Sequence, residues 1–153
     1  MRIRNAAIVL SLLVMTLAAP CEAKRLLEIK DVAVRAPPQQ PPTLEQVQRA
    51  ILEALDSKGW QGKVERPGLI RGEITVHHTH HAVVEIPYST RSYSIRYVSS
   101  QGLGYNPASK TIRHNYNSWV QKLQRRIDEH TATPEDGRWS PRQIPWPWRS
   151  SRS

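Results

Sequence analysis

The sequence predicts a small α+β domain: a helix, a three-stranded antiparallel meander and a second helix, with both helices on one face of the sheet. Three observations lead to this prediction. Apolar residues recur at helical spacing in two separate segments, and between these segments apolar and polar residues alternate. The chain has 153 residues, a length that typically holds one domain. We place the domain at residues 43–130.

The first predicted helix starts at Thr43. Gln46 follows three residues later, and this pair forms a capping box, in which the two side chains bond to backbone donors that a helix start leaves free. The apolar stripe that follows has helical spacing and consists of Leu44, Val47, Ile51, Leu52 and Leu55. Gly59 is well placed to end the helix.

Three segments then show the two-residue period of half-buried strands: residues 70–76, 82–88 and 93–97. Pairing Val76 with Ala82, and Tyr88 with Tyr93, keeps one apolar face intact across both hairpins. Because a slip of one residue would exchange the two faces, the pattern favours a meander with this register.

The second helix is expected over residues 115–129, with Asn115 as its cap. Its buried stripe consists of Tyr116, Trp119, Val120, Leu123 and Ile127.

Composition restricts the function. The formal charge is +9 and the hydrophobic fraction is 39%, below the globular average of roughly 45–50%. A single cysteine excludes an internal disulfide framework and a cysteine-cluster zinc site. No glycine-rich phosphate loop, GxSxG, HExxH or CxxC motif occurs, so the commonest enzyme signatures are missing. We assign no catalytic residue.

Residues 1–23 are typical of a secretory signal peptide: a basic start, an apolar run and a small-residue exit. A core helix or a short anchor is the alternative. The apolar run of about 14 residues is shorter than the roughly 20 that span a bilayer. Cleavage is expected after Ala23. Alternatively, Cys21 is lipidated, although Pro20 occupies a position where a bacterial lipobox has a small residue.

Two segments flank the predicted domain. Residues 24–42 contain a proline-rich stretch, which we interpret as a linker, either a spacer or an ordinary N-terminal arm. Residues 131–153 form a basic tail rich in Trp, Pro and Arg, expected to be disordered. Its Trp146, Trp148, Arg149 and Arg152 suit an anionic membrane surface or an envelope polyanion. The alternative is that its tryptophans dock on the domain.

A histidine cluster spans residues 77–81. In the expected register His77 and His81 face each other, close enough to share a Zn or Cu ion. With no carboxylate nearby, the alternative is a solvated hairpin tip, and a pH-sensing role is a further possibility.

Two other groups invite a catalytic interpretation. Glu73 and Glu85 would oppose each other, but Arg71 and Arg96 lie close by, and a solvent-exposed salt-bridge ladder explains the same residues. The loop between Tyr105 and Asn117 is rich in hydrogen-bonding side chains. It suits a sugar or a peptide, or a structural role in turns and caps.

One pattern is familiar: Tyr93-Ser94-Ile95-Arg96-Tyr97, then Leu103, Tyr105 and Ile112, then Tyr116-Asn117-x-Trp119-Val120-x-x-Leu123. Over roughly residues 60–127 the chain resembles a group of small, uncharacterised exported proteins and lipoproteins of proteobacteria. The resemblance implies a location in the cell envelope and supplies no catalytic residues. This chain departs from the group in its imperfect lipobox and its Trp-rich tail.

Together these features predict an exported envelope protein that acts as a non-enzymatic binding or accessory module. Its expected partner is an envelope protein or polymer, or an anionic membrane surface contacted by the tail. The export signal disfavours nucleic acid, despite the basic charge. Two alternatives are a Zn or Cu protein using His77 and His81, and an enzyme acting on an envelope polymer through the Tyr105–Asn117 loop.

Overall fold

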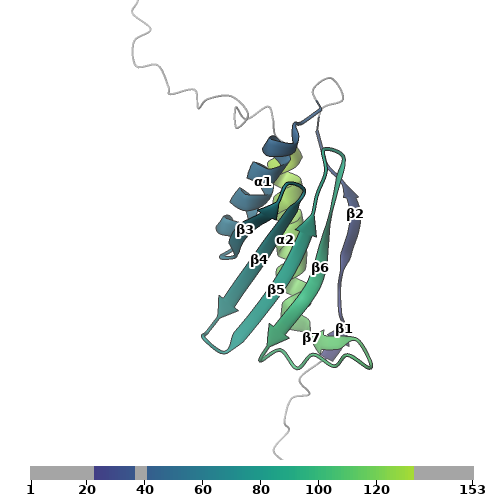
Figure 1. Ribbon diagram of the computed structural model, residues 1–153. Coiled ribbons are helices and arrows are strands. Elements are labelled where there is room, and N and C mark those ends of the chain that lie inside the picture. Colours follow the sequence, from purple (N-terminus) through teal and green to yellow (C-terminus); the bar gives the residue numbers. More distant parts are fainter. Residues whose placement is uncertain (1–22, 37–40, 133–153) are drawn as a thin grey trace, which may run out of the picture.

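The computed structural model describes residues 23–36 and 41–132, in which two helices pack on one face of a five-stranded antiparallel sheet (Figure 1). The elements follow the order β1 (Ala23–Arg25), β2 (Ile29–Ala33), α1 (Leu44–Ser57), β3 (Gln61–Arg66), β4 (Leu69–Val76), β5 (His80–Pro87), β6 (Ser92–Gln101), β7 (Thr111–Arg113) and α2 (His114–Ala132). In the large sheet the strand order is β2-β6-β5-β4-β3, and β1 pairs with β7 in a separate two-stranded sheet.

The protein is therefore an α+β fold with two helices and two sheets, and the expected three-stranded meander is wrong. Two strands of the large sheet were missed. β2 lies in the segment assigned to a linker and pairs with β6, with Ile29 opposite Ile95. β3 lies between the first helix and the expected first strand, and all six of its residues are exposed, so no apolar alternation marks it. The proline-rich stretch thus connects β2 to α1.

The first helix begins as its capping box predicts. The Thr43 hydroxyl accepts a hydrogen bond from the Gln46 backbone N–H at 3.2 Å, and the Gln46 side chain accepts one from the Thr43 N–H at 2.7 Å. The helix ends at Ser57, two residues before Gly59. Two backbone donors at the helix start are thereby satisfied locally, which explains why sequence located this end correctly.

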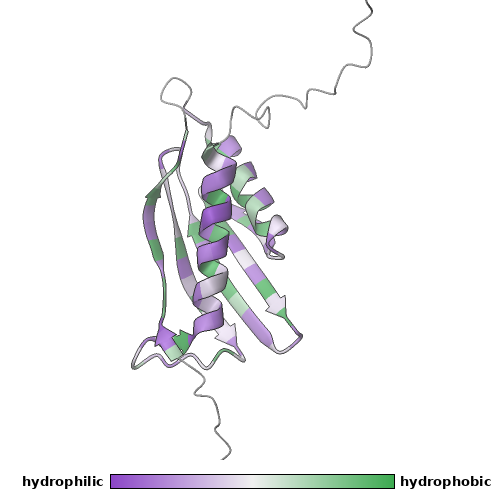
Figure 2. Cartoon of the chain, turned by 180° about the vertical axis from the view of Figure 1, so that it is seen from behind, coloured by the Kyte–Doolittle hydropathy of each residue, from purple (hydrophilic) through white to green (hydrophobic). Residues whose placement is uncertain are grey.

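The core lies between the sheet and the helices. α1 contributes Val47, Ile51 and Leu55, and α2 contributes the buried stripe Tyr116, Val120, Leu123 and Ile127. Seen from behind, the outward surface of α2 is mainly hydrophilic (Figure 2). A pair of opposed glycines, Gly62 and Gly72, lets α1 approach the sheet closely. A Cβ on Gly62 would lie 2.9 Å from Leu55 Cδ1, and one on Gly72 would lie 3.0 Å from Leu55 Cδ2.

The register differs from the expectation in one hairpin. Between β4 and β5 the expected pairing is wrong by two residues, because Ala82 faces Ile74 and Val76 faces His80. Between β5 and β6 the Tyr88–Tyr93 pairing is confirmed, and a bulge follows at Val83–Val84. A shift of two residues leaves the same side chains on each face, so the apolar pattern did not distinguish the two registers.

Candidate functional site

The candidate site is the face of the sheet that the helices leave uncovered. The register aligns one charged residue from each of four neighbouring strands, in the order Lys63, Arg71, Glu85, Arg96. Within this face Arg71 Nε lies 3.1 Å from Glu73 Oε1, and Lys63 Nζ lies 3.6 Å from Glu65 Oε1. The surface thus carries charges of both signs, with opposite charges paired along β3 and along β4.

The register shows that the expected pair of opposed carboxylates, Glu73 and Glu85, is wrong. Glu73 faces Val83, and Glu85 lies between Arg71 and Arg96, so the two carboxylates do not oppose each other. An acid/base pair needs two carboxyl groups directed at one reacting bond. Glu73 is instead paired with Arg71 of its own strand, whereas Glu85 lies opposite Arg71 and Arg96 with no ion pair among the described residues, so the alternative of a salt-bridge ladder holds for Glu73 alone.

A shallow depression of about 210 Å³ opens at one corner of this face, beside the turn that joins β5 to β6. It is lined by Asp31, Pro87, Tyr88, Ser89, Ser92, Tyr93, Ser94 and Arg96. Asp31 belongs to the irregular part of β2 and has a φ of 48°. The Asp31 N–H donates to Ser94 Oγ at 3.0 Å, and Ser94 Oγ donates to Asp31 Oδ1 at 3.4 Å. This mutual bonding fixes the Asp31 carboxylate at the rim.

The two tyrosines of the depression direct their hydroxyls into the protein. Tyr88 donates to Gln48 Oε1 at 2.7 Å and Tyr93 donates to Asp128 Oδ1 at 2.6 Å. Burial, followed by the hydrogen bond to Asp128, raises the pKa of Tyr93, so its hydroxyl stays protonated. The polar groups left to a ligand are the Asp31 carboxylate, the Arg96 guanidinium and the Ser92 hydroxyl, because the Ser89 and Ser94 hydroxyls donate within the protein. This set suits binding of a small polar group.

The histidine cluster does not adopt the expected geometry. His77 and His78 form the turn between β4 and β5, both with positive φ, at 52° and 58°. His81 faces Thr75, and its Nδ1 lies 3.1 Å from Thr75 Oγ1, so the expected opposition of His77 and His81 is wrong. In the described part of the chain, no group of three or more His, Cys, Asp or Glu residues is arranged to hold a metal ion.

The loop from Tyr105 to Asn117 uses its asparagines in the fold. Asn106 Oδ1 accepts the backbone N–H groups of Ala108 and Ser109, at 2.9 and 3.3 Å. Asn117 bridges the link between β1 and β2, accepting from the Leu27 N–H at 3.0 Å and donating to the Arg25 carbonyl at 2.8 Å. These contacts support the structural interpretation of the loop. The depression lies at the other end of the sheet (Figure 1).

A cluster of tyrosines packs beneath this loop. The Tyr97 ring lies 4.5 Å from that of Tyr105 and meets Tyr116 edge-on at 5.6 Å, measured between ring centroids. Tyr116 is fully buried, and its hydroxyl has no hydrogen-bond partner among the residues described. Burial, followed by the nearby Glu28 and Tyr97, raises the pKa of Tyr116.

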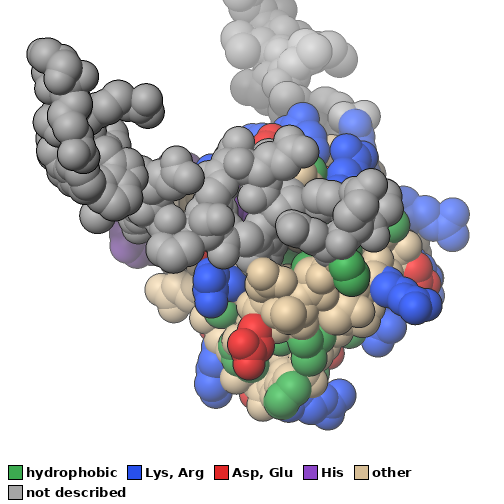
Figure 3. Space-filling view, turned by 90° about the horizontal axis from the view of Figure 1, so that it is seen from above, with side chains coloured by type: hydrophobic (Ala, Val, Ile, Leu, Met, Phe, Trp, Pro, Cys, Tyr) green, Lys and Arg blue, Asp and Glu red, His purple; other side chains and the backbone are tan. Residues whose placement is uncertain are grey.

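Several predicted residues lie outside the described part of the chain. They are the signal segment, Cys21 included, and the tail residues Trp146, Trp148, Arg149 and Arg152. Ala23, the expected cleavage residue, is the first residue of β1 and faces Arg113. No helix in the described ranges has the length and apolar character that a membrane crossing requires. At the end of the molecule seen in Figure 3, Lys and Arg side chains are spread around the margin.

Sequence reasoning missed the Asp31 corner. Asp31 was assigned to a linker, and no sequence pattern relates it to Ser94. Only the pairing of β2 with β6 brings the two residues together. Comparison with known proteins identified no matching family model, no similar curated protein and no similar solved structure.

Proposed function

We propose that the protein is an exported component of the cell envelope that acts as a non-enzymatic binding module. The observation that carries this proposal is the uncovered face of the sheet. Helices bury the opposite face, whereas this one presents charges of both signs across four strands and a depression at its corner. The pattern of residues 1–23 supports the location, and so does the resemblance to exported proteins.

Mixed charge favours a protein or a polar polymer of the envelope as the partner of this face. A surface of one sign attracts opposite charge without much geometric selection, whereas a surface that carries both signs requires a complementary pattern. The depression adds a carboxylate and a guanidinium at one corner, which suits a group that both donates and accepts hydrogen bonds.

The tail supplies a second contact in this proposal. Residues 138–153 carry four arginines, three tryptophans and no acidic residue. Indole rings favour the membrane interface and arginines are attracted to anionic head groups. We expect deletion of residues 138–153 to reduce cosedimentation with anionic vesicles, most strongly at low salt. Unchanged cosedimentation would show that the tail is not the membrane contact.

Site-specific crosslinking in the producing cell tests the uncovered face. A photoreactive residue at Ser99, which is exposed opposite Val83, is expected to give one dominant adduct. The same residue at Lys122, exposed on α2, is the matched control. Arg96→Ala should weaken the Ser99 adduct, and Arg125→Ala should not. Equal adducts from Ser99 and Lys122, or none from Ser99, would contradict the proposal.

A further inference from the structure

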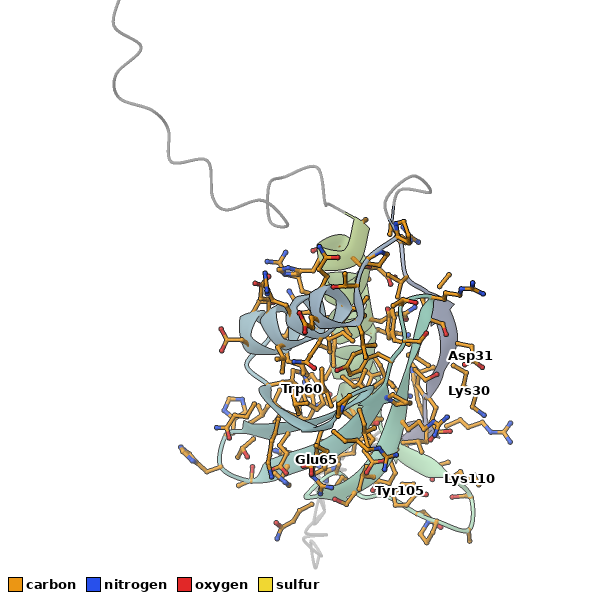
Figure 4. All side chains as sticks on the ribbon, turned by 45° about the horizontal axis from the view of Figure 1, so that its top comes forward. Lys30, Asp31, Trp60, Glu65, Tyr105 and Lys110 are labelled. Atoms are coloured by element: carbon orange, nitrogen blue, oxygen red, sulfur yellow. The ribbon has the colours of Figure 1, made fainter. Side chains whose placement is uncertain are left out.

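β3 is an edge strand whose outer side is unpaired in the described structure. It is the last strand of the large sheet and all six of its residues are exposed. Figure 4 shows Glu65 on this strand and Asp31 on β2, which forms the opposite edge. The backbone groups of an edge strand are a template for a further strand. β2 is irregular in its middle, between Ile29 and Val32, whereas β3 pairs regularly with β4 from Gln61 to Val64 and is irregular only at its end, between Val64 and Arg66.

The side chains of β3 are arranged to match a second β3. Lys63 and Glu65 lie on the uncovered face, where their charged atoms are 3.6 Å apart. Val64, between them, faces Ile70 on the helix side and is one of two exposed large apolar residues in the described ranges, at 36%. On the same side of β3, Leu52 of α1 is only partly buried and lies against Gly62, where a Cβ would be 2.8 Å from Leu52 Cδ2. The edge therefore combines an apolar strip with a pair of opposite charges.

Geometry restricts how two copies can pair. In a symmetric antiparallel pair, the two helix-covered faces lie on the same side only when the two-fold axis is perpendicular to the sheet. One residue of β3 then lies opposite the same residue of the second copy, and this residue is the centre of the pair. Centring the pair on Val64 sets Lys63 of each copy against Glu65 of the other and covers the two valines. Centring it on Lys63 or on Glu65 opposes like charges instead, which is destabilising. One register alone satisfies both charges and the apolar strip.

From this self-complementarity we infer that β3 pairs antiparallel with β3 of a second copy, centred on Val64, and joins two five-stranded sheets into one. The partner is the protein itself. The inference is independent of the proposed binding function, because the uncovered face and the depression stay accessible in such a dimer.

Charge-reversal variants test this register. Lys63→Glu gives two acidic residues on the edge and Glu65→Lys gives two basic ones, so each variant alone is expected to dimerise at least about tenfold more weakly. An equimolar mixture of the two variants should form a heterodimer, and the double variant Lys63→Glu/Glu65→Lys should recover the homodimer. Lys122→Glu makes the same charge change as Lys63→Glu on exposed α2 and should leave dimerisation unchanged.

Sedimentation velocity of the mature protein purified from the producing cell, over a range of concentrations, measures dimerisation. Circular dichroism verifies that each variant is folded. A wild-type chain that stays monomeric throughout would overturn the inference. So would a dimer that both single variants leave unchanged, because its interface would lie elsewhere. Weakened single variants without recovery in the mixture would reject the Val64 register.

Discussion

Among the glycines of the described ranges, Gly102 has the least room for a side chain. Its φ is 73°, and a Cβ there would overlap the carbonyl oxygen of Thr79 in the β4–β5 turn. Gly102→Ala is therefore expected to lower the free energy of unfolding by more than about 2 kcal/mol. Urea denaturation measures this change.

Gly104→Ala is the control for that substitution. Gly104 also has a positive φ, 58°, but a Cβ there would meet only the Arg113 side chain, at 3.9 Å. Its cost should be limited to the conformational strain, about 1–2 kcal/mol. Equal losses for the two variants would mean that the Thr79 contact is not what constrains Gly102.

Two buried tyrosines should respond in opposite ways to loss of the hydroxyl. Tyr93→Phe removes a 2.6 Å hydrogen bond to Asp128 and is expected to cost about 1–3 kcal/mol. Tyr116→Phe removes a hydroxyl without a partner among the described residues, so stability should stay the same or rise by about 1 kcal/mol. Guanidinium denaturation of both variants gives the comparison. A large loss in Tyr116→Phe would reveal a bonded hydroxyl.

The same two tyrosines should make the stability of the fold sensitive to alkaline pH. Burial raises the pKa of Tyr93 and of Tyr116 in the folded chain, whereas in the unfolded chain a tyrosine titrates at about pH 10. Above that pH the unfolded state loses protons that the folded state retains, so stability falls as pH rises. Thermal unfolding midpoints measured across that pH should decline in the wild type. They should decline less in Tyr93→Phe/Tyr116→Phe; equal slopes would contradict this reasoning.

At the scale of elements, the sequence predicted those helices and strands whose apolar residues recur with a regular period. Both helices were predicted because the buried stripe lies within one continuous segment. The expected cap Asn115 is wrong, because α2 begins at His114 and Asn115 lies in its first turn. β3 was not predicted, because its six residues are exposed and Val64 is its single apolar side chain. β2 was not, because the irregularity around Asp31 interrupts its period. β2 is defined by its pairing with β6, which is distant in the chain, and β3 by backbone pairing with the adjacent β4. Neither pairing is recorded in a local apolar pattern.

The candidate site was predictable in part for the same reason. Arg96 opposite Glu85 was expected from the β5–β6 register and is confirmed. Opposition of Glu73 and Glu85 was wrong, because the β4–β5 register depends on the turn. His77 and His78 both adopt positive φ there, a conformation that two-residue hairpin turns usually build with Gly, Asn or Asp, so no residue type marks this turn in the sequence.

Asn117 makes a testable link between elements. Its amide is bonded to the backbone of both Arg25 and Leu27, so it fastens the β1–β2 segment to α2. Asn117→Ala should speed amide exchange in β1 and β2 severalfold while the helices keep their protection. Hydrogen exchange followed by mass spectrometry resolves the segments. Asn115→Ala, at an exposed position two residues earlier, is the control and should leave exchange unchanged. Uniform acceleration by Asn117→Ala would indicate global destabilisation instead.

At the scale of the whole molecule, the fold determines where signal cleavage after Ala23 or a lipid on Cys21 would lie relative to the domain. β1 begins at Ala23, and the Leu26 N–H donates to the Lys110 carbonyl at 2.8 Å, so the fold starts close to the expected cleavage site. The proline-rich stretch lies between β2 and α1, within the domain, and offers no tether. A lipid on Cys21 would be separated from β1 by Glu22 alone. The β1–β7 end would then be held against the membrane.

Intact mass of the chain, taken separately from soluble and membrane fractions of the producing cell, distinguishes the two routes. We expect a soluble species beginning at Lys24, because Cys21 and Ala23 are small residues at the positions that signal cleavage requires, whereas Pro20 is foreign to a lipobox. Cys21→Ser should then give the same mature mass, since the cysteine is removed with the signal. A membrane species carrying acyl chains, lost in Cys21→Ser, would refute this expectation and place the β1–β7 end at the bilayer surface.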